Sequence, residues 1–292
     1  MSGIINEKGT GWLPDFPDFR DYTLKQDKVE PMIKQVGVEK TLDESNLPTS
    51  TDLREWCSPI KDQGKISSCT ANAGVSMVEY YEKRSFGKYL DESRLFLYKT
   101  TRNLMQKTGD SGAYIRKTME SLVLFGLPPE EYWPYNIESF DMEPSTFCYA
   151  FGQSYKTILY VRLDPLDGSK DDLLNRIKTN LVAGLPTMFG FTVYSSITNA
   201  ASNGEIPFPG DVDRLAGGHA VMTVGYDDSK KIKIPNSDKE TNGALLIRNS
   251  WGEKWGEKGY GWLPYDYVRS GLAVDWWTIL KNDWIDTGVF KI

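Results

Sequence analysis

One cysteine in this sequence lies where a nucleophile would be expected. Cys69 follows a polar loop that begins near Gln63 and precedes an apolar pattern with helical spacing, which places it in the first turn of a helix. The partial positive charge and unpaired N–H groups at the start of a helix favour a thiolate, and a protonated histidine nearby would lower the cysteine pKa further. A cysteine at this position is also often a small buried hydrophobe, so further residues are needed to define a site.

His219 is the only histidine in the chain, and it heads an apolar segment directly after Gly217 and Gly218. Imidazole is the usual acid/base partner of a catalytic thiol, although a single histidine at a strand edge is also a common structural hydrogen-bonding residue. Two glycines before it let another backbone come close. With one histidine and no closely spaced cysteine pair, we expect no metal.

Asn249 ends a predicted strand and begins a long loop, residues 249–261, that is rich in tryptophan and glycine. Asn249-Ser250-Trp251 could be an N-glycosylation acceptor, or the loop could be a turn-rich surface segment. Neither interpretation accounts for all the tryptophans. The loop is therefore a third candidate part of a site.

The elements that must position these residues divide the chain into two halves. Helical patterns are expected over residues 68–87, from about residue 91, and over residues 112–126. After residue 144 the pattern changes to strands, with one helix among them. The strands are expected at 157–163, 186–194, 219–226 and 245–248, and the helix at 171–182. A helical half followed by a sheet half predicts an α+β fold with a cleft between the halves.

Composition excludes several classes of function. The 292 residues carry a net charge of -6 and no cluster of basic residues, so nucleic acid is not an expected partner. The apolar runs are too short for a membrane span, so no membrane partner is expected. Cys57, Cys69 and Cys148 permit at most one disulfide. Residues 1–10 lack the apolar stretch of a secretory signal peptide, so we expect a cytoplasmic protein or export by another route.

Taken together, the three segments resemble the papain family of cysteine peptidases, from about residue 47 to the C-terminus and in the family's order. Gln63 stands six residues before Cys69, and His219 stands 150 residues after it, as in that family. The chain departs from the family at Ile66, where a disulfide-forming cysteine is usual, and at Thr70, where a tryptophan is usual. Bacterial members with short leaders, such as xylellain, are the more similar type.

The resemblance implies a helical subdomain over about residues 47–143 and an antiparallel, β-barrel-like subdomain over about residues 144–292, with the active site in the cleft between them. It implies that Cys69 is the nucleophile, His219 its acid/base partner, Asn249 the residue that orients the histidine, and Gln63 an oxyanion donor. Polypeptides are the implied substrates, and no metal or organic cofactor is required. The implied substrate-binding residues are Ser111, Gly112, Ala113, Tyr114, Gly217, Gly218 and Trp251, although Ser111 and Gly112 could equally be only the start of a helix.

Residues 1–46, here called the leader, read as an extended segment that does not support its own fold. We expect the leader to be an inhibitory propeptide that places its apolar residues in the cleft, with a disordered tail as the alternative. Those residues are Trp12, Leu13, Phe16 and Phe19. Two other functions stay open for the whole chain: a catalytically silent binding protein, and an acyl transferase or ligase that uses the same site.

Overall fold

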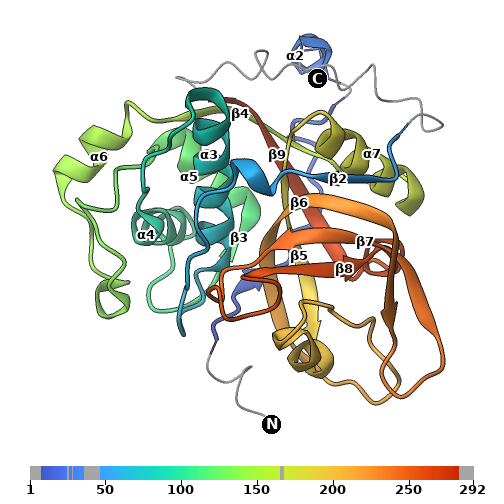
Figure 1. The fold of residues 1–292 in the computed structure, drawn as a ribbon. Coiled ribbons are helices and arrows are strands. Elements are labelled where there is room, and N and C mark those ends of the chain that lie inside the picture. Colours follow the sequence, from blue (N-terminus) through green and yellow to red (C-terminus); the bar gives the residue numbers. More distant parts are fainter. Residues whose placement is uncertain (1–7, 25, 28, 36–46, 165–167, 283–292) are drawn as a thin grey trace.

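The computed structural model describes residues 8–24, 26–27, 29–35, 47–164 and 168–282. Helices gather on one side of the molecule and a sheet on the other (Figure 1). The α+β prediction is confirmed. The predicted end of the leader at residue 46 and the last ten residues of the predicted peptidase domain lie outside the described residues.

The helical half is built around a long central helix, α3. This helix begins directly after Ser68 and ends at Gly87, whose left-handed conformation (φ 70°) lets its N–H bond the Lys83 carbonyl. Both ends agree with the predicted 68–87. The helices of this half are α3 (Cys69–Phe86), α4 (Arg94–Leu104), α5 (Ile115–Leu124) and α6 (Thr146–Gly152).

The other half contains one seven-stranded sheet with the order β4-β9-β5-β6-β7-β8, while β2 pairs with β6. All these pairings are antiparallel. Among the described residues the sheet is open, because β4 and β8 lie at opposite ends of the order, so the barrel-like curvature that was expected does not close. The strands are β2 (Ser50–Asp52), β4 (Thr157–Arg162), β5 (Thr187–Tyr194), β6 (Leu215–Lys233), β7 (Glu240–Arg248), β8 (Tyr260–Pro264) and β9 (Ala273–Asn282).

Two helices lie in the sheet half, α7 (Lys170–Val182) and α8 (Tyr265–Arg269). α7 starts with a capping box, in which Ser169 accepts from the backbone N–H of Asp172 and the Asp172 carboxylate accepts from the backbone N–H of Ser169. This local signal explains why the helix predicted at 171–182 is confirmed to within a residue. Short 3-10 turns occur at Arg54–Trp56, Ile137–Ser139 and Ser195–Ala201.

The leader lies against both halves. Its strand β1 (Trp12–Leu13) pairs in parallel with β3 (Ala113–Tyr114), and Thr23 forms a bridge with Arg162 at the edge strand β4. The extended conformation was expected, but α2 (Glu30–Gln35) was not. Among the described residues, no helix is both long and apolar enough to cross a membrane.

Candidate active site

Cys69 is the first residue of α3, and its side chain is fully buried. Burial raises the pKa of the Cys69 thiol to about 12, and backbone N–H groups of Ala220, Thr70, Cys69 itself and Trp12 offset part of that rise. A lowered cysteine pKa was expected from the helix N-terminus. That expectation is wrong for this structure, because the effect of burial outweighs that of the N–H groups around the sulfur.

His219 and Asn249 meet because β6 and β7 are neighbours in the sheet. His219 Nε2 lies 2.8 Å from Asn249 Oδ1, so the ring is held by an amide that carries no charge. Burial lowers the pKa of His219 to about 4, while the bond to Asn249 acts in the opposite direction. The other ring nitrogen, Nδ1, makes no hydrogen bond within the described residues. The backbone N–H of Ala220, the residue after His219, points at the Cys69 sulfur. The histidine and the thiol are therefore neighbours.

Trp251 covers this pair. Its ring stacks on the His219 ring with centroids 4.6 Å apart and an interplanar angle of 27°. Trp255 packs edge-on against Trp251, and both tryptophans are buried. The loop after Asn249 therefore keeps water away from the His219–Asn249 bond.

Gln63 is fully buried, and the loop after β7 fixes its side chain. Its Oε1 accepts a hydrogen bond of 2.6 Å from Ser250 Oγ, which leaves the amide nitrogen as a donor on the other side. That nitrogen donates to the carbonyls of Ile66 and Gly9, at 3.0 Å each. Gly9 belongs to the leader, so Gln63 points at the leader backbone.

The leader backbone runs through the site from Gly9 to Trp12. The Gly9 carbonyl also accepts from Trp251 Nε1 at 3.1 Å, and the Gly9 N–H donates to the Gly64 carbonyl at 2.8 Å. The Gly11 N–H donates to the Gly218 carbonyl at 2.9 Å. A methyl group on Gly9 would lie 2.1 Å from the Ile66 carbonyl oxygen, so only glycine lets the chain approach this closely.

Most of the residues predicted to bind substrate line this path. Ala113 donates its N–H to the Gly11 carbonyl at 2.9 Å, and Tyr114 is the β-partner of Leu13. Gly112 approaches the same carbonyl so closely that an added Cβ would lie 2.3 Å from its oxygen, and Gly217 lies beside Thr10. Ser111 is different, because its hydroxyl bonds the neighbouring Gly112 carbonyl, and the Gly112 N–H bonds the Tyr98 hydroxyl rather than the leader.

The prediction that the leader places four apolar residues in the cleft is wrong for two of them, Phe16 and Phe19. Trp12 is buried, with 6% exposed, but Phe16 and Phe19 are 86% and 90% exposed. Leu13 is partly buried. Asp15 and Asp18, the acidic residues between Trp12 and Phe19, pair with Arg116 of the protein body.

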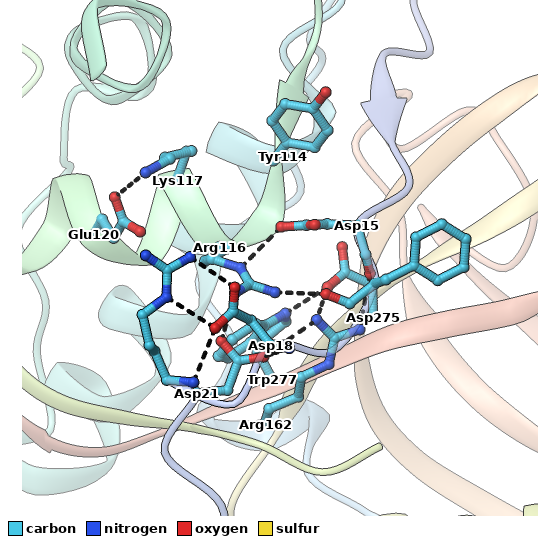
Figure 2. A network of polar contacts seen from close by, with 12 residues as sticks. Asp15, Asp18, Asp21, Tyr114, Arg116, Lys117, Glu120, Arg162, Asp275 and Trp277 are labelled. Atoms are coloured by element: carbon cyan, nitrogen blue, oxygen red, sulfur yellow. Dashed lines mark hydrogen bonds and ion pairs between the residues drawn. The ribbon is translucent and has the colours of Figure 1, made fainter. Parts of the chain in front are cut away.

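Those acidic residues belong to an Asp–Arg cluster that the sequence reasoning missed (Figure 2). Arg116 of α5 binds Asp15 at 2.8 Å and Asp21 at 2.7 Å, and its Nη1 lies 3.9 Å from Asp18. Arg162 of β4, almost fully buried, lies 3.7 Å from Asp21. The three aspartates recur every third residue in the leader, a pattern that the sequence shows. Arg116 and Arg162, which bind them, belong to no recognisable sequence motif.

Among the described residues, the other two cysteines form no disulfide and the acidic side chains form no metal site. Cys57 and Cys148 are free and buried, so the disulfide left open by the sequence does not form. In the part of the chain that the structure describes, no group of three or more histidine, cysteine, aspartate or glutamate side chains could hold a metal ion.

A buried thiol at a helix start, beside a histidine held by an asparagine, defines a cysteine peptidase of the papain type. The papain family cysteine protease model matches residues 47–284. The chain belongs to the papain family and is a papain-like cysteine peptidase.

Relatives and solved structures agree with this membership. A peptidase C1-like protein of Acanthamoeba polyphaga mimivirus is 32% identical over 282 residues, which cover 92% of this chain and 86% of the viral protein. The structure of xylellain, a cysteine protease from Xylella fastidiosa, is similar with a TM-score of 0.73 and 33% identity, covering 93% of this chain and 96% of xylellain. Cathepsin K of Gallus gallus is 28% identical over 238 residues, and the match spans 63% of that protein's length.

Proposed function

We propose that this protein is an endopeptidase that cleaves polypeptides through a thioester on Cys69, and that it is made as a zymogen inhibited by its own leader. The observation that carries the proposal is the path of the leader backbone. Residues Gly9 and Gly11 bond to groups around Cys69, namely Gln63, Trp251, Gly218 and Ala113. A substrate cannot enter while these bonds are made.

Each proposed step uses a group that the site supplies. The Cys69 thiol gives its proton to His219, the sulfur attacks the peptide carbonyl carbon, and the Gln63 amide and the Cys69 backbone N–H stabilise the resulting oxyanion. His219 gives its proton to the leaving amine, and the C–N bond breaks to leave a thioester. His219 then takes a proton from water, whose oxygen attacks the thioester and releases the acid. Asn249 fixes the ring in both steps without adding charge.

The leader blocks this chemistry in two ways. Its Gly9 carbonyl oxygen takes the Gln63 amide hydrogen that the oxyanion would need. The leader also excludes water from the site. Burial raises the pKa of Cys69 and lowers that of His219, so both groups are neutral. When the leader leaves, water returns, and the thiolate–imidazolium pair that attacks a carbonyl becomes favourable.

The Asp–Arg cluster supports the same assignment of the leader. Three leader carboxylates meet Arg116 and Arg162, outside the catalytic residues. Arg162 also donates to the Asp15 carbonyl at 2.9 Å and from its backbone to the Tyr22 carbonyl at 2.8 Å. A tail without a function would not need partly buried charges matched in this way.

Thiol alkylation tests the proposal. The full-length chain is folded with a recognition sequence for a site-specific protease inserted between residues 36 and 46, and half of the sample is then cut and separated from its leader. At mildly acidic pH, iodoacetamide should label Cys69 rapidly in the cut enzyme and slowly in the uncut chain, with labelled positions read by mass spectrometry. Only the cut enzyme should cleave a peptide library.

Variants make this test specific. Cys69→Ala should abolish cleavage, and His219→Ala should abolish both cleavage and the fast labelling at acidic pH. Equal labelling of Cys69 before and after cutting would refute inhibition by the leader. Fast labelling without any cleavage would favour the binding-protein alternative, and products joined to an added amine would favour acyl transfer.

A further inference from the structure

The side chain of Arg116, near the start of α5, makes its polar contacts with the leader. It pairs with Asp15 at 2.8 Å and with Asp21 at 2.7 Å, and it lies 3.9 Å from Asp18. Its Nη2 donates to the Phe16 carbonyl at 2.7 Å. Among the described residues, every ion pair and hydrogen bond of this guanidinium therefore goes to the leader, as Figure 2 shows.

The neighbouring Arg162 differs, because the protein body supplies carboxylates for it. It binds Asp164 at 3.0 Å and Asp275 at 3.3 Å. The guanidinium carbons of Arg116 and Arg162 lie 5.7 and 5.2 Å from the centre of the same Trp277 ring. Two cations beside one ring repel each other unless carboxylates compensate them. In the proposed enzyme without its leader, Arg162 would keep two carboxylate partners, and Arg116 would keep none of those it has here.

The protein body also holds the Arg116 guanidinium in place. The Trp277 ring below it is fully buried in the sheet half, and a cation over an aromatic face is attracted by the ring. The Arg116 side chain is 12% exposed even with the leader bound, so it lies against the protein and does not extend into solvent. A held cation beside another cation, with no carboxylate of the body paired to it, is a binding site for an anionic group.

The pairing of β1 with β3 determines which residue of an extended chain meets Arg116. Trp12, whose backbone N–H points at the Cys69 sulfur, is the β-partner of Ala113. Three residues further along each chain are Asp15 and Arg116, which bind each other. Extended chains rise by about 3.3 Å per residue in either direction. A substrate that pairs with β3 would therefore bring to Arg116 a residue about three positions from the one beside Cys69.

The leader shows how an acidic residue is recognised at this place. Asp15 Oδ2 accepts from Arg116 Nε at 2.8 Å, and the Asp15 carbonyl accepts from Arg162 Nη2 at 2.9 Å. The next carbonyl, that of Phe16, is bound by Arg116 as well. Every polypeptide supplies backbone carbonyls, whereas only an acidic residue supplies the carboxylate. The charge at Asp15 therefore carries the selectivity.

We propose that Arg116 determines specificity: in the enzyme without its leader, it selects polypeptide substrates that carry aspartate or glutamate about three residues from the residue beside Cys69. A neutral side chain there leaves the cation unpaired, and a lysine or arginine adds a third positive charge next to Arg116 and Arg162. The leader then occupies with Asp15 the place that an acidic substrate residue takes. The proposal rests on the proposed function, since it names which peptides that activity prefers.

Peptide binding to the cut Cys69→Ala protein tests Arg116 without any cleavage. The probes are two fluorescently labelled peptides with the sequence of residues 8–17, one unchanged and one with Asp15→Asn, and neither contains Asp18 or Asp21. By fluorescence anisotropy, the unchanged peptide should bind about tenfold more tightly at low salt, and less so at high salt. In the Arg116→Gln background the two affinities should be equal. A ratio that Arg116→Gln does not change would refute recognition by this arginine.

Digestion of a random peptide library by the cut enzyme then tests the substrate preference. Mass spectrometry of the products should show aspartate and glutamate enriched over asparagine and glutamine about three residues from the residue beside Cys69. Arg116→Gln should remove the enrichment, and Arg116→Glu should replace it with lysine and arginine. Arg269→Gln is the matched control, because Arg269 is an exposed arginine that binds Asp171 of the protein body. The same profile in Arg116→Gln as in the wild type would overturn the inference.

Two peptides chosen from the digest, differing only by glutamate or glutamine at that position, separate recognition from folding. The ratio of their kcat/KM values should be about ten in the wild type and in Arg269→Gln, and near one in Arg116→Gln. An equal loss for both peptides in Arg116→Gln, with the ratio kept, would mean that Arg116 is only structural. If no peptide is cleaved, the proposed function fails, and the binding measurements still decide the role of Arg116.

Discussion

The side-chain amide of Gln63 is restrained by three hydrogen bonds, and one of them goes to the leader. The Ser250 hydroxyl fixes the amide oxygen, so the nitrogen must face Ile66 and Gly9. In the proposed enzyme without its leader, the amide hydrogen that now bonds Gly9 would point into the site with no rearrangement of the side chain. Such prearranged donors are the ones that stabilise a developing oxyanion well.

Gln63→Ala should therefore lower kcat in the cut enzyme by about 10²–10³ and change KM much less. Alkylation of Cys69 by iodoacetamide forms no oxyanion, so its rate should change by less than about tenfold. Steady-state kinetics and labelling of one sample measure both effects. Gln153→Ala is the control, because Gln153 is exposed and its side-chain amide donates to the Leu124 carbonyl, outside the site. A parallel loss of kcat and labelling would mean that Gln63 acts by positioning Cys69.

Individual site residues could be named from the sequence where each lies in a short, marked segment. Cys69 starts a helix, His219 follows two glycines, and Asn249 begins a loop rich in tryptophan. The hydrogen bond between Trp12 and Asp275 could not be predicted in this way, because the direction of Asp275 depends on how β9 pairs with β5. A register shift between distant strands leaves no local pattern in the chain.

At the scale of elements, the leader is held by its backbone as much as by its side chains. Gly9 and Gly11 lie against the segment that precedes α3, and Gly11 has a φ of 127°. An added Cβ on Gly11 would lie 2.4 Å from the carbonyl oxygen of Ser67. The strand β1 can therefore form in the cleft only if these positions are glycine.

Gly11→Ala should displace the leader and raise the Cys69 alkylation rate of the uncut chain by more than about tenfold. Gly87→Ala is the matched control. Gly87 also has a positive φ, but an added Cβ there meets nothing within 4 Å. It should lower the melting temperature, at a cost of about 1–2 kcal/mol, without changing labelling. A labelling rate in Gly11→Ala equal to that of the wild type would show that the leader docks without close backbone contact.

The Asp–Arg cluster should contribute to leader binding independently of the glycines. Arg116→Gln removes the partner of three leader carboxylates, so labelling of Cys69 in the uncut chain should accelerate at least about tenfold. Arg20→Gln removes an exposed arginine that pairs with Asp18 inside the leader, and its effect should stay below about twofold. Similar rates for the two variants would assign the cluster to folding rather than to inhibition.

The helices were more predictable than the strands, for a physical reason. Local caps mark α3, α4 and α7, whereas β6 and β7 continue beyond the apolar runs that predicted them. The outer part of their hairpin, such as Lys231 paired with Asn242, is held by backbone bonds and carries polar side chains. β8 was not predicted, and its first two residues were assigned to the loop 249–261. It contains Gly261 and Pro264, which an edge strand tolerates and a central strand does not.

At the scale of the whole molecule, hydrogen bonds join the two halves. In each of them, a side chain of one half donates to a backbone carbonyl of the other half. Tyr81 of α3 donates to the Ile279 carbonyl of β9 at 2.7 Å, and Tyr80 donates to the Gly184 carbonyl at 2.9 Å. Arg248 of β7 donates to the carbonyls of Ser58 and Pro59. These bonds link the two walls of the cleft, and none of them involves a residue of the leader.

The helical half also contains a buried carboxyl cluster that makes global stability depend on pH. Glu92 is fully buried, and burial together with the nearby carboxyls of Glu82 and Glu79 raises its pKa well above the ordinary value of 4.5. The folded protein therefore keeps the Glu92 proton at pH values where the unfolded chain has lost it. The stability from this group is fully present below about pH 4.5 and is lost as the pH rises through the raised pKa.

Glu92→Gln removes this dependence, because an amide has no proton to lose and can still donate to a neighbouring carboxylate. Across the window above pH 4.5, the wild type should lose up to about 1.4 kcal/mol of unfolding free energy per pH unit relative to the variant. Urea unfolding of the uncut chains at several pH values measures the difference, with the exposed Glu131→Gln as control. Parallel curves for the wild type and Glu92→Gln would mean that Glu92 is ionised in the fold, and that Lys61, whose charge acts on Glu92 in the opposite direction, outweighs its burial.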